Sequence, residues 1–262
     1  MPSSALQVAR TGLEAQDTRM RVIANNLANV STTAFKRDRA NFATLAYQDA
    51  RVAGAASSNE TTYATGLNLG TGVGVQSTTR METQGSLQTT GNSLDLALDG
   101  DGYFQVTLPG GQLAYTRAGN FTRSSEGVLV TSQGYALEPS ITIPEGATSI
   151  TISEDGTVSA QLAGQSAPSE LGQITVATFT NPSGLQAASD NFLLETAASG
   201  AAQVGVAGQE GRGQIRQGML EASNVNIVEE LVDMIETQRA YEINSKMISA
   251  VDEMLRNANQ TL

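Results

Sequence analysis

Residues 4–30, with the sequence SALQVARTGLEAQDTRMRVIANNLANV, predict a long amphipathic helix near the start of the chain. The stretch contains a single glycine, Gly12, and no proline, so little in it opposes a helix. Side chains recur every seven residues at Leu6, Leu13, Met20 and Leu27, each followed after three residues by Ala9, Gln16, Ile23 or Val30. This heptad pattern is typical of a helix that buries one seam against another helix. Such a helix would be about 40 Å long.

Residues 226–262 repeat the pattern at the other end of the chain, again without glycine or proline. Asn226, followed three residues later by Glu229, predicts a helix start with a capping box. One side of the seam is apolar, at Ile227, Met234, Tyr241, Ile248 and Leu255, and the other is mainly polar, at Leu231, Gln238, Ser245 and Asp252. Polar seam residues weaken an isolated helix pair. We therefore expect the helices to pack on each other, on neighbouring copies of the chain, or on both.

The middle of the chain follows other patterns. Residues 37–75 open with a mixed-charge run and continue through Ala-, Ser-, Thr- and Gly-rich sequence without a helical period, which predicts extended chain and loops. Residues 76–218 alternate short β-rich runs with Asp-Gly and Pro-Gly turn signals. The clearest runs are Tyr103–Val106, Ile141–Ile143, Ile150–Ile152 and Ile174–Val176. They predict a mostly antiparallel β domain inserted between the two helices.

Together these patterns predict an α+β fold in four parts. The parts are an N-terminal helix in residues 1–36, an extended linking stretch in 37–75, a β-rich outer domain in 76–218 and a C-terminal helix in 219–262. The two heptad helices are expected to form a coiled-coil-like inner layer, with the β domain outside it. Because neither helix can bury its seam alone, this order of parts favours a protein that assembles with other copies of itself.

The composition excludes several classes of function. The net charge of -11 provides no basic field for nucleic acid. The chain contains no His and no Cys, which excludes a Ser-His-Asp triad, a disulfide and a thiolate metal site. No apolar run is long enough to span a membrane, and Met1–Val8 lacks the basic start and apolar core of a secretory signal peptide. We expect no cofactor, no metal and no membrane insertion.

Two motifs suggest chemistry that their surroundings do not support. Residues 99–102, with the sequence DGDG, resemble the start of a calcium loop, but Tyr103 and Gly110 stand where that loop needs oxygen ligands. A tight turn between strands is the better interpretation. Adjacent acids such as Glu229 and Glu230 point about 100° apart on a helix, so they do not converge on a substrate. We therefore predict no catalytic residues and no enzyme activity.

Several strings resemble signatures of the bacterial flagellar axial proteins, which build the rod and the hook. The strings are IANNLANVSTTAFK at 23–36, DGDGYF at 99–104, YTRAGNF at 115–121, SNVNIVEELVDMI at 223–235 and QRAYEINSK at 238–246. The resemblance covers essentially the whole chain. Within the family, the chain length and residues 66–75, GLNLGTGVGV, favour a subunit of the distal rod. A proximal-rod or hook-type subunit is the alternative, although hook proteins usually carry a larger middle.

The resemblance implies a structural subunit that self-assembles into a helical tube and acts as a drive shaft from motor to hook. It implies passage through the flagellar type III export apparatus, without a cleaved signal peptide, and addition beneath a rod cap. Implied neighbours are copies of the chain, the proximal rod proteins, the hook protein, and the peptidoglycan and outer-membrane ring proteins. The implied location is the basal-body rod that spans the periplasm.

The heptads and the resemblance together predict assembly residues at both ends of the chain. They are Leu6, Leu13, Met20, Ile23, Asn26, Leu27 and Asn29 in the N-terminal part, and Ile227, Leu231, Met234, Tyr241, Ile248 and Leu255 in the C-terminal part. Another class of function is a binding or adhesion module carried by the β domain. That class would account for the β-rich middle but not for heptad helices at both ends.

Overall fold

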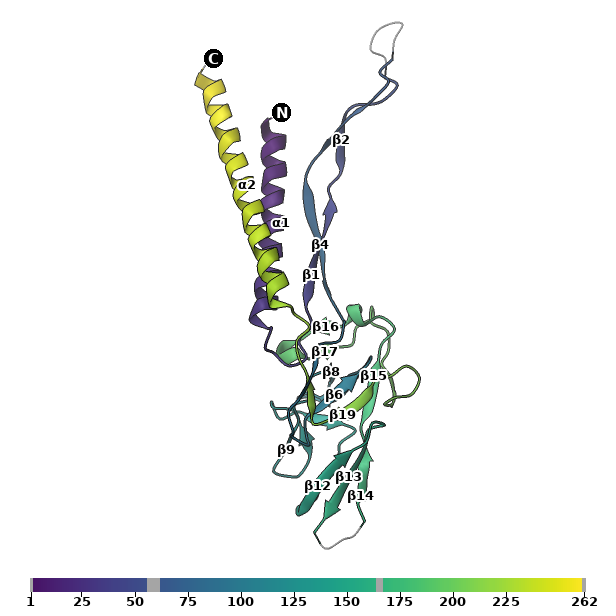
Figure 1. Cartoon of the computed structure of the whole chain (residues 1–262). Helices are drawn as coiled ribbons and strands as arrows, with labels where there is room; N and C mark the ends of the chain where they lie inside the picture. Colours follow the sequence, from purple (N-terminus) through teal and green to yellow (C-terminus); the bar gives the residue numbers. More distant parts are fainter. Residues whose placement is uncertain (1, 56–61, 164–166, 261–262) are drawn as a thin grey trace. The chain divides into compact units, whose positions relative to one another are not determined.

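The computed structural model describes residues 2–55, 62–163 and 167–260 (Figure 1). The chain forms two compact units. Unit 1 contains Met1–Ala28, Asp38–Thr79 and Asn226–Leu262, and unit 2 contains Asn29–Arg37 and Arg80–Val225. The chain therefore passes between the units at four places, and each unit is built from segments that are far apart in the sequence.

Unit 1 contains the two predicted helices, α1 (Pro2–Ala28) and α2 (Ile227–Gln260), which lie side by side (Figure 1). The predicted start of α2 is confirmed, because the Asn226 side-chain oxygen accepts a hydrogen bond from the Val228 amide at 3.1 Å. Both helices are shorter than the parts assigned to them. Residues 29–36 are not helical, and Met219–Glu221 forms strand β20. The α+β class is confirmed, while coiled-coil packing of the helices stays a prediction.

The linking stretch forms a two-stranded ribbon beside α1 in unit 1 (Figure 1). Strand β1 (Asp38–Thr44) pairs with β4 (Val73–Arg80), and β2 (Tyr47–Arg51) pairs antiparallel with β3 (Leu67–Gly70). The stretch is extended, as predicted, and pairing satisfies backbone groups that a single extended chain would leave to water. Gly72 has φ +119°, and a Cβ there would lie 2.1 Å from the Thr11 hydroxyl oxygen. Glycine therefore allows the ribbon to approach α1 closely.

Unit 2 contains the β-rich part of the chain. Its strands are β5 (Leu87–Thr89), β6 (Leu96–Asp99), β7 (Tyr103–Thr107), β8 (Leu113–Thr116), β9 (Thr122–Arg123), β10 (Leu129–Val130), β11 (Ala136–Glu138), β12 (Ala147–Ile152), β13 (Thr157–Leu162), β14 (Ser169–Gln173), β15 (Thr175–Thr178), β16 (Gln186–Ala187), β17 (Leu193–Leu194), β18 (Gln203–Val206), β19 (Gln214–Gln217) and β20. Short 3₁₀ helices occupy Pro182–Gly184 and Ser189–Asn191.

The main sheet of unit 2 follows the order β16-β17-β8-β7-β11-β10-β9, and β15 joins it by pairing with both β7 and β18. Strands β12, β13 and β14 form a second sheet, while β19 pairs with β6 and β20 pairs with β5. The strand pairs of unit 2 are antiparallel. The prediction of a mostly antiparallel β domain is confirmed.

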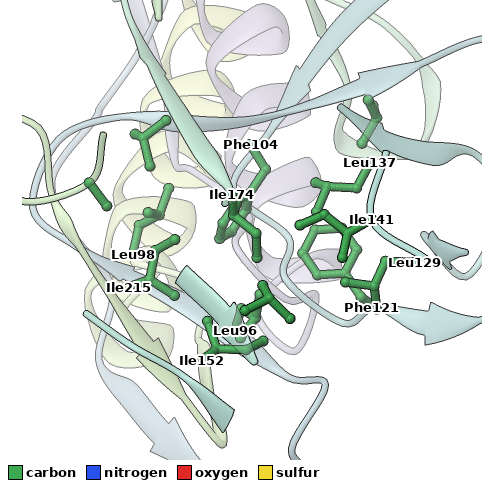
Figure 2. Packing of buried hydrophobic residues seen from close by; sticks show 14 of the residues in the cluster. Leu96, Leu98, Phe104, Phe121, Leu129, Leu137, Ile141, Ile152, Ile174 and Ile215 are labelled. Carbon is green, nitrogen blue, oxygen red and sulfur yellow. The ribbon is translucent and has the colours of Figure 1, made fainter. Parts of the chain in front are cut away.

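Aliphatic and aromatic side chains from many strands form the main core of unit 2 (Figure 2). A second, smaller cluster contains Tyr103, Tyr115, Ala177, Phe179 and Leu193. Phe104 is fully buried and packs edge to face on Phe121, with ring centroids 5.3 Å apart. The predicted strand at Ile141–Ile143 is wrong, because this segment makes only an isolated bridge between Thr142 and Val128. Both isoleucines are nevertheless buried in the core. Their backbones each make one hydrogen bond with residues 127–129, so the segment is paired at a single bridge that does not extend into a strand.

We expect Phe104→Ala to lower the free energy of unfolding by about 3–5 kcal/mol, because the change leaves a cavity in a closed core. Leu113→Ala is the matched control, since Leu113 lies on the paired strand β8 but is 42% exposed. Chemical denaturation of the full-length chain measures both variants. Equal losses of unfolding free energy in the two variants would contradict the placement of Phe104 in the core.

Candidate assembly interface

The contact between α1 and α2 includes several small and polar side chains, although Ile23 of α1 and Val251 of α2 are buried apolar residues. A Cβ on Gly12 would lie 3.1 Å from the Asn244 side-chain nitrogen, so the two helices approach closely at this point. Arg19 pairs with Asp233 at 3.3 Å. Thr237, between these two levels of α2, is fully buried. The face of α2 that meets α1 therefore holds few of its large apolar residues.

Asn26 connects three segments of unit 1. Its side-chain nitrogen donates to the Asp38 carbonyl at 2.9 Å, and its side-chain oxygen accepts from the Asp38 amide at 3.0 Å. The same nitrogen lies 3.3 Å from a carboxylate oxygen of Glu230 on α2. Both Asn26 and Glu230 are buried. An amide, with one donor and one acceptor end, suits this double contact with a backbone peptide.

The structure places the residues predicted for assembly at different depths. In the N-terminal part, Ile23 and Asn26 are buried, while Leu6, Leu13, Met20, Leu27 and Asn29 are partly buried. In α2, Met234 and Ile248 are partly buried, whereas Ile227, Leu231 and Tyr241 are exposed. The side chain of Leu255 lies outside the described residues. Exposure leaves these α2 residues available to a second molecule.

Further exposed apolar residues on α2 were missed by the heptad analysis. Val228 is 70% exposed, and Val232 and Ile235 are about half exposed. Together with Ile227 and Leu231 they form one stripe on the first turns of α2, roughly opposite the face that meets α1. We call these five residues the α2 stripe. Their i, i+4 spacing is the signal that could have found them, but a strict seven-residue repeat passes over it.

A buried charge cluster in unit 2 gathers segments that are distant in the sequence. The carboxylate of Glu221, whose side chain is fully buried, contacts Lys36 Nζ at 2.6 Å and Arg117 Nε at 2.8 Å. It also accepts a hydrogen bond from the Gly85 amide at 2.9 Å. Lys36 donates in addition to the Thr83 carbonyl at 2.8 Å. We call Lys36, Arg117 and Glu221 the buried triad.

The environment of the triad sets the charge of its members. Burial opposes ionisation of Glu221, but the charge of Arg117 and the hydrogen bond from Lys36 outweigh it and hold the pKa of Glu221 below its usual value. Burial, aided by repulsion from Arg117, lowers the pKa of Lys36 although Glu221 opposes this. Lys36 and Arg117 are both buried cations that pair with the single carboxylate of Glu221. Removing the charge of Glu221 would therefore leave both cations without a counter-charge.

The triad and its surroundings account for most of the strings singled out in the sequence. Arg117 donates to the Gly100 carbonyl at 2.9 Å and to the Gly102 carbonyl at 3.1 Å, which joins YTRAGNF to DGDGYF. A Cβ on Gly119 would meet the Leu96 carbonyl oxygen at 1.7 Å, so that position requires glycine. The Asn224 side chain accepts from the Arg37 amide at 2.7 Å and donates to the carbonyls of residues 81 and 83.

Neither a membrane helix nor a metal site is found in the parts of the chain that the structure describes. No helix within residues 2–55, 62–163 and 167–260 is long and apolar enough to cross a bilayer. In the same residues, no group of acidic side chains is placed to hold a metal ion.

Comparison with known proteins places these features in a family. The family model "Flagella basal body rod protein" matches residues 6–36, "Flagellar hook protein FlgE/F/G D1 domain" matches 97–160, and "Flagellar basal body rod FlgEFG protein C-terminal" matches 216–261. The chain is 50% identical to the flagellar basal-body rod protein FlgG of Buchnera aphidicola subsp. Acyrthosiphon pisum, over 98% of both chains. It is also 48% identical to FlgG of Caulobacter vibrioides, over 98% of both chains. It is 34% identical to FlgF of that bacterium, over 92% of this chain and 90% of FlgF.

These matches confirm the resemblance to the axial proteins, and they define the class of the protein as a structural component of the flagellar rod and hook. The identity and the coverage then decide the particular group within that class. The chain belongs to the family of the flagellar basal-body rod protein FlgG.

We expect Glu221→Gln to lower the free energy of unfolding of the full-length chain by about 3–5 kcal/mol, because two buried cations lose their counter-charge. Lys36→Met should cost less, since Arg117 still neutralises Glu221. Glu126→Gln, which alters an exposed acid of unit 2, should change stability by less than about 0.5 kcal/mol. Denaturant titration measures all three, and a Glu221→Gln variant as stable as Glu126→Gln would refute the role of the triad.

Stability should also depend on pH through Glu221. Its pKa is lower in the folded chain than the value of about 4.3 in an unfolded one. The stabilisation is therefore present above about pH 4.3 and is lost as the pH falls from there through the folded-state pKa. Unfolding titrations between pH 7 and acid should show a steeper loss for the original chain and for Lys36→Met than for Glu221→Gln. The same slope in all three proteins would argue against this linkage.

Proposed function

We propose that the chain is a structural subunit of the distal rod of the flagellar basal body and serves no catalytic role. The observation that carries this proposal is the likeness to FlgG over nearly the full length of both proteins. The identity to FlgG exceeds the identity to FlgF within one bacterium, which favours the distal rod over another rod position. In this role the subunits form a helical tube that transmits torque from the motor to the hook.

The exposed apolar surface of α2 supports assembly through the ends of the chain. Within the described residues the α2 stripe stays exposed, while α2 meets α1 on another face that includes the polar contacts of Asp233 with Arg19 and of Glu230 with Asn26. Burial of each large aliphatic side chain would stabilise a contact by roughly 1.5–3 kcal/mol. Unit 2, in contrast, has a closed core of its own. The terminal helices would therefore make the inner contacts of the tube.

Contacts of the α2 stripe would join different surfaces on neighbouring subunits. Such heterologous contacts continue without closing when the rotation between subunits does not complete a ring, and the result is a helical polymer. Within this proposal, Leu6, Leu13 and Met20 on α1, and Ile227 and Leu231 on α2, contribute to subunit contacts. Their partial or full exposure in the single chain is consistent with this role.

The proposal includes the neighbours of a rod subunit. These are other copies of the chain, the proximal rod proteins, the hook protein, the rings in the peptidoglycan layer and outer membrane, the rod cap and the type III export apparatus. The location is the part of the rod that crosses the periplasm. Export as an unfolded chain is consistent with the absence of cysteine from the sequence, because no disulfide has to be broken.

The α2 stripe gives the test of this proposal. We expect Leu231→Asp to abolish incorporation of the chain into rods, because a carboxylate would be buried in an apolar contact. Leu113→Asp is the matched control, since Leu113 is 42% exposed and Leu231 is 43% exposed, but Leu113 lies in unit 2. Basal bodies isolated from a strain that carries only the variant are examined by electron microscopy, and circular dichroism checks the fold.

Two results would count against the proposal. Rods of normal length built from Leu231→Asp subunits would show that the α2 stripe is not an assembly contact. Intact rods in a strain from which the chain is missing altogether would show that it is not a rod subunit, and a proximal-rod, hook-type or binding function would then need to be tested by the same deletion.

A further inference from the structure

The charges of unit 2 are strongly unbalanced. Unit 2 contains seven Lys and Arg residues against fourteen Asp and Glu residues, so copies of this unit repel one another unless cations lie at their contacts. Between Arg123 and Arg212 the sequence contains no basic residue at all. The few cations of unit 2 are therefore the groups that can favour a contact between two copies of this unit.

Most of these cations are already engaged within the unit. Lys36 and Arg117 pair with Glu221, Arg212 pairs with Glu210, and Arg216 pairs with Asp99 and Glu154. Arg37 and Arg80 have interactions of their own. Among the described residues of unit 2, Arg123 is the basic side chain without a hydrogen-bond or ion-pair partner. It is exposed on β9, which is the last strand of the main sheet path.

An open cavity of about 210 Å³ lies around β15 and the loops near it in unit 2. Its walls include Glu82, Asp101 and Glu210, together with the rings of Tyr103 and Phe179. Glu82 accepts a hydrogen bond from the Tyr103 hydroxyl at 2.8 Å, and Glu210 is paired with Arg212. In the described part of the chain, the exposed Asp101 carboxylate has no partner.

The chemistry of this cavity suits an arginine side chain. An apolar cavity of about 150 Å³ is large enough for benzene, so the volume here admits a guanidinium group. The exposed Asp101 carboxylate offers a charge-assisted hydrogen bond. Tyr103 and Phe179 are themselves buried, and the Arg117 guanidinium already faces the Tyr103 ring, so the carboxylate is the main attraction. Arg117 also lines the cavity, but its guanidinium is held by Glu221 and by backbone carbonyls.

We propose that Arg123 of one subunit inserts into the Asp101 cavity of a second copy of the chain and so joins neighbouring β units in the rod. Strand β9 and strand β15 lie on opposite sides of unit 2 (Figure 1). The two halves of the contact are therefore on different flanks of one molecule. A contact of this kind is heterologous and repeats from copy to copy without pairing off as a dimer. The inference rests on the proposed self-assembly and adds a contact outside the terminal helices.

Charge reversal at each half of the contact tests the inference. Arg123→Glu places a carboxylate beside Asp101, and Asp101→Arg places a guanidinium beside Arg123. Each single variant should raise the critical concentration for polymerisation of the full-length chain by about tenfold or more, since like charges at a contact are costly. Sedimentation of polymers at increasing protein concentration measures this quantity. Glu126→Gln, close to Arg123 in the sequence, is the control that should polymerise normally.

Combining the variants separates a specific contact from a general effect of charge. The double variant Arg123→Glu with Asp101→Arg restores an opposite-charge pair in every contact and should regain normal polymerisation. A mixture of the two single variants should also co-assemble, because each type of subunit then meets the other at both flanks. Subunits of one single variant alone cannot form this alternating arrangement, because every contact would then join like charges.

The outcomes also distinguish this inference from the proposed function. Normal polymerisation of Arg123→Glu would overturn the inference and leave rod assembly through the terminal helices intact. Loss of assembly in the double variant and in the mixture would likewise overturn it, because it would show that the residues act separately. If the original chain never polymerises and is absent from isolated rods, the proposed function itself fails.

Discussion

The buried carboxylate of Glu221 is the constraint on which the rest of the β unit depends. A fully buried charge is tolerated only when opposite charges and hydrogen bonds surround it, and here Lys36, Arg117 and the Gly85 amide provide them. Residues 29–37, 80–85 and 221–225 thereby meet within unit 2. These segments adjoin the four places where the chain passes between its two units. The triad therefore holds unit 2 residues close to three of these crossings, after residues 37, 79 and 225, in defined positions.

Unit 1 is held together in a different way. Its helices and its ribbon meet through Gly12 with Asn244, Gly72 with Thr11, and the Asn26 amide with the backbone of Asp38. These contacts specify position, but they bury little of the large aliphatic surface that usually stabilises helix pairs. The α2 stripe stays exposed as a result. Under the proposed assembly, further molecules that cover the α2 stripe would stabilise unit 1.

Some sequence predictions failed for identifiable reasons. The heptad analysis placed its seam on other positions of α2, whereas the face that meets α1 contains Glu230, Thr237 and Asn244. These residues also recur every seven positions, but they are polar, so a search for an apolar repeat passed over them. The β-rich segment Ile141–Ile143 is buried without forming a strand, because it supplies side chains to the core while its backbone makes only one bridge. Residues 219–221 form a strand rather than helix because β5 lies beside them to pair with.

The sequence by itself determined the two long helices at the ends of the chain, the extended stretch after the first, and an antiparallel β-rich middle. These features depend on local periodicity, on glycine and proline, and on turn signals, all of which are visible along the chain. Only the tertiary structure decided that Lys36, Arg117 and Glu221 form one buried triad, and which face of α2 stays exposed. The physical reason is that a buried charge needs counter-charges close in space, and their positions along the sequence give no sign of that proximity.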